Sequence, residues 1–206
     1  MWQIVFETLK NMHSSPGAGA RNRGFTVVEI MITLLVLSVL VVITAPALTN
    51  LIKDNRLLSQ VYSLRAALNA ARSQALAERT LVTVCPSTDG GSCAGQWHQG
   101  FIAFTDMNGN GQVDDPNDPA GDEILVSDKA GAGSIIILYD QADNLVRFNS
   151  RGYSVDAAGS ATSGTFTVCD DRGQNEARGV IVAPVGGVRA ALPDPNDPSG
   201  RVLDFG

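Results

Sequence analysis

The longest apolar run of the chain covers residues 25–45, where 16 of 21 side chains are apolar. The polar exceptions in this run are Thr26, Glu29, Thr33, Ser38 and Thr44. A helix of this length spans roughly 30 Å, which matches the hydrocarbon core of a bilayer. A cleaved secretory signal fits less well, because the apolar part of such signals covers only about 7–15 residues. The run therefore predicts a membrane-spanning helix.

A second apolar pattern follows on one face of a helix. Between Leu48 and about Arg79 the chain contains neither Gly nor Pro. Apolar residues recur there at alternating steps of four and three: Leu57, Val61, Leu64, Leu68, Ala71 and Ala75. This periodicity predicts one helix from Phe25 to Arg79, whose second half packs one face on a sheet. A free coiled coil is the alternative, although the repeat is short for one.

After Arg79 the sequence changes to short β-rich runs between Gly, Asp, Asn and Pro turns. The candidate strands are Leu81–Cys85, Gly100–Thr105, Glu123–Ser127, Ser134–Tyr139, Leu145–Asn149, Thr165–Cys169, Gly179–Ala183 and Arg201–Phe205. The fold class is therefore α+β, with one long helix packed on an antiparallel β-sheet head.

The charges divide the chain at the same places. Arg21 and Arg23 precede the apolar run, which favours a cytoplasmic N-terminus and an outward head. The whole chain has 15 basic and 21 acidic side chains, a formal charge of −6, and residues 80–206 alone carry −10. This acidic balance argues against a nucleic-acid binder that relies on bulk electrostatics.

One residue inside the apolar run and the residue directly after it suggest function. Glu29 places a carboxylate inside an apolar helix, where such a group is costly and is a functional candidate by default. Pro46 follows 21 residues after Phe25 and predicts a kink or break in the helix.

The string Gly24-Phe25-Thr26-Val27-Val28-Glu29, followed by the apolar run and Pro46, resembles the N-terminal signature of type IV pilins and type II secretion pseudopilins. The resemblance implies that a prepilin peptidase cleaves between Gly24 and Phe25 and that Phe25 becomes N-methylated. It also implies that Glu29 neutralises the terminal amine of a neighbouring subunit during filament assembly. An ammonium and a carboxylate attract strongly in a low dielectric, whereas either alone is costly there. Met12 could be the true start in place of Met1, which would shorten the leader.

The head carries a second resemblance, to the GspH/FimT family of minor pilins and pseudopilins. Its residues are Cys85-Pro86-Ser87-Thr88-Asp89-Gly90 with Cys93, Trp97, Gly100-Phe101, Val146-Arg147-Phe148 with Gly152, and Gly164-Thr165-Phe166-Thr167-Val168-Cys169-Asp170. The resemblance implies a pilin fold with a leader (1–24), a transmembrane and assembly helix (25–45), its amphipathic continuation (46–79) and a periplasmic or extracellular head (80–206). Other pilins and the prepilin peptidase would be its partners, and the bacterial inner membrane and then a filament tip its locations.

DNA uptake is the alternative function within this family. Its DNA-binding FimT members have a Gly-Arg-x-Arg motif, and the matching stretch here is Gly186-Gly187-Val188-Arg189, which lacks the first Arg. Arg178 and Arg189 could still form a small basic patch, but phosphate binding needs several convergent cations. A remote alternative is a membrane-anchored hydrolase built from Ser87, Asp89 and His98. We expect no enzyme, because only sequence proximity supports that set.

One loop has the residue types of a calcium site. Asp106, Asn108, Asn110 and Asp114 match the first nine positions of an EF-hand loop, and Gly111 stands at the turn position. Asn117 replaces the usual Glu at the twelfth position, although Asp115, Asp118, Asp122 or Glu123 could substitute. The alternative is a polar hairpin turn with no ion. We expect no other cofactor.

The three cysteines allow one disulfide and one free thiol. A periplasmic or extracellular head lies in an oxidising compartment, so a disulfide is allowed there. Cys85–Cys93 would close a short loop, and Cys85–Cys169 would join two strands. The sequence leaves both pairings open.

Overall fold

The computed structural model describes residues 24–114, 121–129 and 134–191. The chain forms two compact units, Met1–Ala47 and Leu48–Gly206. Helix α2 runs from Val27 to Glu78 and contributes to both. It is the one helix in the described part of the chain that is long and apolar enough to cross a membrane, and the mean hydropathy of its most apolar stretch is 2.8.

The helix continues through position 46, so the break predicted at Pro46 is wrong. A proline inside a helix removes one backbone hydrogen bond and one donor, here the donor to the Val42 carbonyl. Membrane-spanning helices tolerate such a loss because neighbouring helices, Ser or Thr side chains and small local adjustments of the backbone satisfy the freed carbonyl.

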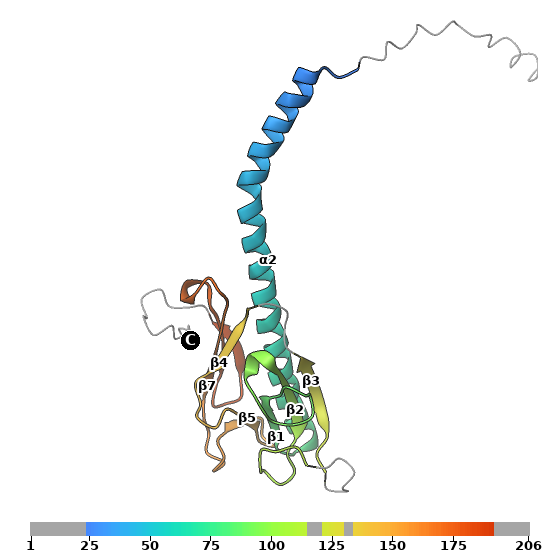
Figure 1. The fold of residues 1–206 in the computed structure, drawn as a ribbon. Helices are drawn as coiled ribbons and strands as arrows, with labels where there is room; N and C mark the ends of the chain where they lie inside the picture. Colours follow the sequence, from blue (N-terminus) through green and yellow to red (C-terminus); the bar gives the residue numbers. More distant parts are fainter. Residues whose placement is uncertain (1–23, 115–120, 130–133, 192–206) are drawn as a thin grey trace, which may run out of the picture. The chain divides into compact units, whose positions relative to one another are not determined.

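The head contains two antiparallel sheets, where the sequence predicted one (Figure 1). The first has the order β3-β2-β1-β5-β6, and the second has the order β4-β7-β8-β9. In chain order the strands are β1 (Val82–Pro86), β2 (Gly100–Thr105), β3 (Ile124–Lys129), β4 (Ile136–Tyr139), β5 (Val146–Phe148), β6 (Ser154–Val155), β7 (Gly164–Cys169), β8 (Arg178–Val182) and β9 (Val188–Ala191). Two short 3-10 helices, η1 (Trp97–Gln99) and η2 (Gln174–Glu176), precede β2 and β8. The strand predicted at Arg201–Phe205 lies outside the described residues.

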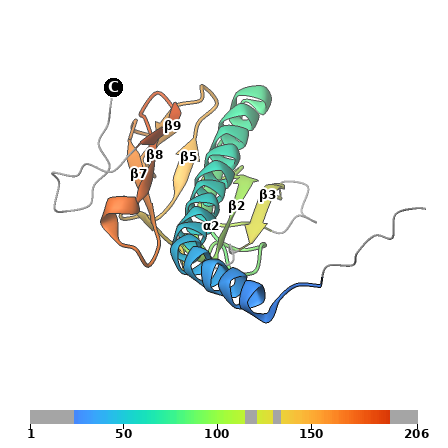
Figure 2. The same ribbon diagram turned by 90° about the horizontal axis from the view of Figure 1, so that it is seen from above.

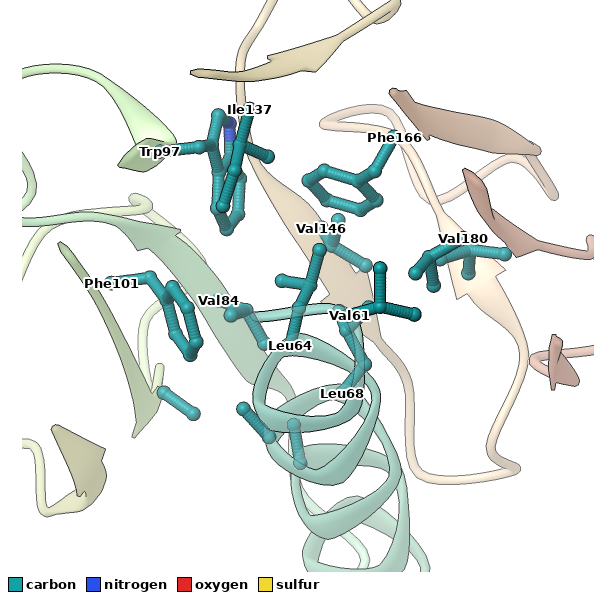
Figure 3. Close-up of a cluster of buried hydrophobic side chains, with 14 of the residues drawn as sticks. Val61, Leu64, Leu68, Val84, Trp97, Phe101, Ile137, Val146, Phe166 and Val180 are labelled. Carbon is teal, nitrogen blue, oxygen red and sulfur yellow. The ribbon is translucent and has the colours of Figure 1, made fainter. Parts of the chain in front are cut away.

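The core of the head lies between the helix and both sheets (Figure 2). All six residues of the predicted apolar face, Leu57, Val61, Leu64, Leu68, Ala71 and Ala75, are at most 2% exposed. Figure 3 shows Leu64 and Leu68 between Val84 and Phe101 of the first sheet and Phe166 and Val180 of the second. The prediction that this face packs on a sheet is confirmed, and the coiled-coil alternative is wrong.

Trp97 connects the two sheets at one side of this core. Its ring meets that of Phe166 edge-on, with centroids 4.8 Å apart. Its indole Nε1 donates a hydrogen bond to Asn144 Oδ1 at 2.6 Å, which satisfies the one polar atom of the side chain. The expectation that Trp97 and Phe166 serve core packing is confirmed, since both are buried.

Candidate functional site

The predicted cleavage position lies in non-helical backbone immediately before α2. Gly24, Phe25 and Thr26 precede the helix, and Phe25 is 77% exposed. The Thr26 hydroxyl accepts the Glu29 backbone N–H at 3.1 Å, as an N-cap does. The sequence analysis missed this role, although Thr26-Val27-Val28-Glu29 has the spacing of a capping box. An exposed, non-helical segment next to a capped helix leaves the bond between Gly24 and Phe25 accessible.

The first half of α2 presents apolar side chains on every face. Its large apolar residues from Val27 to Ile43 are between 45% and 78% exposed. Glu29 is the one acidic residue of its first turn, and its side chain is also exposed. An exposed apolar surface of this extent is typical of a segment that contacts lipid or other helices.

The disulfide joins Cys85 of β1 to Cys93, eight residues later, which is the first of the two pairings that the sequence left open. Cys169 of β7 is a free, half-buried thiol. Its burial, with a smaller contribution from the Asp170 carboxylate, raises the pKa of the Cys169 thiol. A raised pKa disfavours the thiolate, so this cysteine lacks the activation of a nucleophile.

The hydrolase set imagined from Ser87, Asp89 and His98 is not assembled in the described part of the head. Ser87 Oγ donates to Asp89 Oδ1 at 3.1 Å, but no described contact joins His98 to either residue. Asp89 instead accepts the backbone N–H groups of Gly91 and Ser92, each at 2.8 Å. These bonds hold the pKa of the Asp89 carboxyl below its usual range, with Gly91 as the largest cause. Asp89 therefore shapes the disulfide loop.

Arg178 and Arg189 do not form the small basic patch that the sequence left open. Arg189 of β9 pairs with Ile181 of β8, three residues after Arg178. Side chains alternate along a strand, so the two arginines lie on opposite faces of the sheet. Arg178 donates to the backbone carbonyls of Glu176 and Ala177. In the described head, this geometry does not provide the convergent cations that phosphate binding needs.

Gly186, the first residue of the stretch compared with the DNA motif, has a structural role. Its φ is +77°, and a Cβ there would collide with the Gly152 carbonyl and meet Arg72 Nε. Arg72 of α2 donates to the carbonyls of Gly152 and Val185 at 3.0 and 3.1 Å. Close packing of this turn on Arg72 therefore requires glycine at position 186.

A network that the sequence analysis missed attaches the loop after β7 to the beginning of the head's helix. Arg172 Nη1 contacts Asp54 Oδ1 at 2.7 Å, and its Nη2 contacts Asp170 Oδ2 at 2.8 Å. Beside it, Lys53 Nζ lies 2.7 Å from Asp171 Oδ2. The hydrogen bonds from Arg172 hold the pKa of the Asp170 carboxyl below its usual range. Asp54 and Arg172 are 118 residues apart, so local sequence patterns gave no signal for this pair.

The loop after β2 brings Asn108, Asn110 and Asp114 together. Asn108 Nδ2 donates to Asp114 Oδ2 at 2.6 Å, and Asn110 Nδ2 lies 3.3 Å from the same oxygen. Asp106 is buried beside them, and its Oδ2 accepts the Gly111 N–H at 3.0 Å. Among the residues that the structure describes, no three His, Cys, Asp or Glu side chains converge as a ready metal cluster.

Comparisons with known proteins agree with these observations. Residues 60–186 match the family model described as type II transport protein GspH, and residues 19–45 match the prokaryotic N-terminal methylation motif. The type IV minor pilin FimU of Pseudomonas aeruginosa is 19% identical, with a TM-score of 0.53 over 73% of this chain and 95% of FimU.

The minor pseudopilin EpsH from the Type 2 Secretion System of Vibrio cholerae is 11% identical, with a TM-score of 0.42 over 66% of this chain and 95% of EpsH. No curated protein sequence matches the chain. The likeness to FimU shows a shared fold of one long N-terminal helix and antiparallel sheets. Because the GspH model covers more than half of its residues, this chain belongs to the family of type II transport protein GspH.

Proposed function

We propose that the chain is a minor subunit of a type II secretion pseudopilus or a type IV pilus, which it enters through the first half of α2. The observation that carries the proposal is the exposed apolar helix of residues 27–45, which begins directly after the cleavage motif and contains Glu29. The GspH family supplies structural filament subunits and is not a known enzyme family. FimU, described as a type IV minor pilin, supports a minor role for a chain of the same fold.

Cleavage between Gly24 and Phe25 would create a new terminal amine four residues before Glu29. Opposite unit charges 4 Å apart attract by about 4 kcal/mol at an effective dielectric of 20. A carboxylate alone in hydrocarbon costs on the order of 3 kcal/mol. Pairing Glu29 with the Phe25 amine of a neighbouring subunit offsets the cost of burying the carboxylate and the cost of burying the ammonium. This compensation favours entry into the filament.

Before assembly, the same segment anchors the chain in the inner membrane as a single-pass helix. Arg21 and Arg23 favour retention of the N-terminus in the cytoplasm, and the head then lies in the periplasm. The prepilin peptidase acts on the cytoplasmic side of this helix. A minor subunit that primes assembly remains at the filament tip.

The test compares Glu29→Ala with Thr33→Ala in the native host. Thr33 lies one turn later on the same exposed face, and its hydroxyl bonds only its own helix, at Ile30 O. We expect both variants to be cleaved before Phe25, as read by mass spectrometry of the N-terminus. Only Glu29→Ala should be missing from sheared filaments on an immunoblot. Normal incorporation of Glu29→Ala would contradict the assembly role.

Two further measurements separate the parts of this proposal. Gly24→Val should block cleavage, because a branched side chain replaces the small residue of the motif, so the leader should remain attached. Deleting the gene and counting surface pili by electron microscopy distinguishes the filaments. Loss of pili would assign the chain to a pilus, and unchanged pili with retained exoenzymes would assign it to secretion.

A further inference from the structure

The loop that follows β2 contains a buried carboxylate with one unpartnered oxygen. Asp106 is 1% exposed, and its Oδ2 accepts hydrogen bonds from Thr83 Oγ1 at 2.7 Å and from the Gly111 N–H at 3.0 Å. Its Oδ1 is buried and has no hydrogen-bond partner among the described residues. Buried charged oxygens are normally met by a donor or a cation, so Asp106 Oδ1 offers a buried anionic acceptor to such a partner.

Oxygen-bearing side chains converge on the same loop. Asn108 and Asn110 both approach Asp114 through Nδ2, while their Oδ1 atoms accept the N–H groups of Asn110 and Gln112. Each amide oxygen keeps a second lone pair for another partner. The spacing places Asp106, Asn108, Asn110 and Asp114 at positions one, three, five and nine, which supply oxygen ligands in calcium loops.

Gly111 stands at the sixth position, where calcium loops turn sharply. Its φ is +72°, and a Cβ there would lie 2.9 Å from both Arg147 Nη2 and Leu145 Cδ1. Arg147 brings a positive charge near the loop, but its Nη1 is paired with Asp143 Oδ2 at 2.7 Å. This ion pair leaves the carboxylates of the loop available to a cation.

A third carboxylate, Asp122, contacts the loop from the segment just before β3. Asp122 is 2% exposed and accepts the N–H groups of Met107 and Asp114, each at 3.0 Å. The loop ends are joined next to it, since the Thr105 N–H donates to Glu123 O and the Glu123 N–H to Thr105 Oγ1. These hydrogen bonds join the described part of the loop that follows β2 to the segment before β3. The twelfth position, Asn117, lies outside the described residues.

We propose that this loop binds one calcium ion, with Asp106 Oδ1 and the Asp114 carboxylate as its charged ligands and the Asn108 and Asn110 amide oxygens as its neutral ligands. Calcium accepts six to eight oxygens in a flexible arrangement, whereas magnesium demands a near-ideal octahedron and retains its waters. When calcium binds, it takes the place of the Nδ2–H groups of Asn108 and Asn110 that now approach Asp114 Oδ2. With so few carboxylates we expect a Kd of about 0.1–1 mM, as in extracellular calcium modules.

The test measures thermal unfolding of the full chain in detergent micelles, in EGTA and then in 10 mM CaCl2 or 10 mM MgCl2. For a Kd of about 0.5 mM, 10 mM calcium should raise the folded-to-unfolded ratio roughly 20-fold. A change of that size raises the Tm of a chain of this length by about 4–7 °C. Magnesium should shift the Tm far less. Calorimetric titration with CaCl2 measures the Kd directly.

Asp106→Asn and Asp114→Asn should abolish the calcium shift. The matched control is Asp156→Asn, because Asp156 also shapes a loop by accepting two N–H groups, from Ala158 and Ser160. This control should keep the full shift. If Asp106→Asn fails to fold, Asp114→Asn decides alone, since Asp114 is only half-buried.

Three results would overturn the proposal: no heat or Tm shift up to 10 mM calcium, an equal shift with magnesium, or an undiminished shift in Asp114→Asn. None of these measurements involves filament assembly, so the calcium proposal and the assembly proposal can fail separately.

Discussion

Helix α2 passes through two environments, and its two halves show how side-chain pattern encodes each one. From Val27 to Ile43 every large apolar side chain is at least 45% exposed, whereas the face from Leu57 to Ala75 is at most 2% exposed. The first half is apolar all round, and the second has a single apolar face. A helix that meets lipid or other helices needs the first pattern, and one that packs on a folded head needs the second.

The polar side chains of the two halves differ in the same way. In the first half they bond their own helix: Thr33 donates to Ile30 O, Ser38 to Leu35 O and Thr44 to Leu40 O. In the second half they reach distant segments: Ser63 bonds Asp128 and Arg72 bonds Gly152. A segment without folded neighbours satisfies its hydroxyls locally, as is required where water is absent. Local bonds also occur in the second half, as from Asn69 to Arg65 O, so what distinguishes this half is its added contacts to distant segments.

The largest expected effect comes from making the same substitution in both halves. Leu64→Ala should destabilise the head by about 2–5 kcal/mol, because it leaves a cavity at a fully buried position. Leu37→Ala should change the free energy of unfolding by less than about 0.5 kcal/mol, because this side chain is already 55% exposed. Urea unfolding followed by Trp97 fluorescence measures both. Equal effects would contradict the division of α2.

The next effect concerns the disulfide, which should stabilise the head alone. Replacing Cys85 and Cys93 with Ser should cost about 2–3 kcal/mol, since a short closed loop is released in the unfolded chain. The matched control is Cys169→Ser, which removes a free thiol and should have a much smaller effect. Urea midpoints with and without reductant check both variants. A wild-type midpoint insensitive to reductant would contradict this prediction.

A smaller effect should appear in acid. Arg172 holds the pKa of Asp170 below its usual range, so Asp170 contributes stability above its unfolded pKa of about 4. That contribution is lost as the pH falls through the lower folded pKa. We therefore expect a fall in Tm below pH 4 that is shallower in Arg172→Gln. Lys53→Gln, which breaks only an exposed pair, should keep nearly the wild-type slope. If the Tm of the wild type, Arg172→Gln and Lys53→Gln fell equally steeply below pH 4, Arg172 would be excluded as the cause of the acid sensitivity.

The smallest effect is on the reactivity of Cys169. Burial raises the pKa of this thiol, so its thiolate fraction at pH 8 is below that of a free cysteine. Iodoacetamide should therefore modify Cys169 several-fold more slowly in the folded head than in urea, as read by mass spectrometry. Equal rates in the two states would contradict the raised pKa.

Local pattern was sufficient for much of this fold, and long-range pairing accounts for what it missed. The apolar face of α2 was predicted residue by residue, and β2 was predicted with its observed bounds. β6 has only two residues, and β9 has the weak strand formers Ala190 and Ala191, so neither stood out. Two sheets rather than one could not be foreseen, because strand order depends on pairing between distant segments.

The candidate sites show the same limit. The motif alone named Gly24, Phe25 and Glu29, since these residues lie within six positions of one another. Asp122 was only one of four residues considered as a substitute for the missing Glu at the twelfth position of the calcium loop. The structure shows that its carboxylate accepts the N–H groups of Met107 and Asp114. The possible patch of Arg178 and Arg189 could not be decided from the sequence, because the face on which a strand residue lies depends on register.

The strand order also has a consequence for crowding. In a filament, the heads of many subunits lie close together. An open sheet edge of one head can then pair with the edge of another head and seed aggregation. The outer strands give such pairing little length or regularity. β6 has two residues, and β4 and β9 have four each, while β3 faces a register shift in β2 and ends in Asp128 and Lys129. Short, irregular and charged edge strands therefore disfavour sheet-to-sheet pairing between the heads.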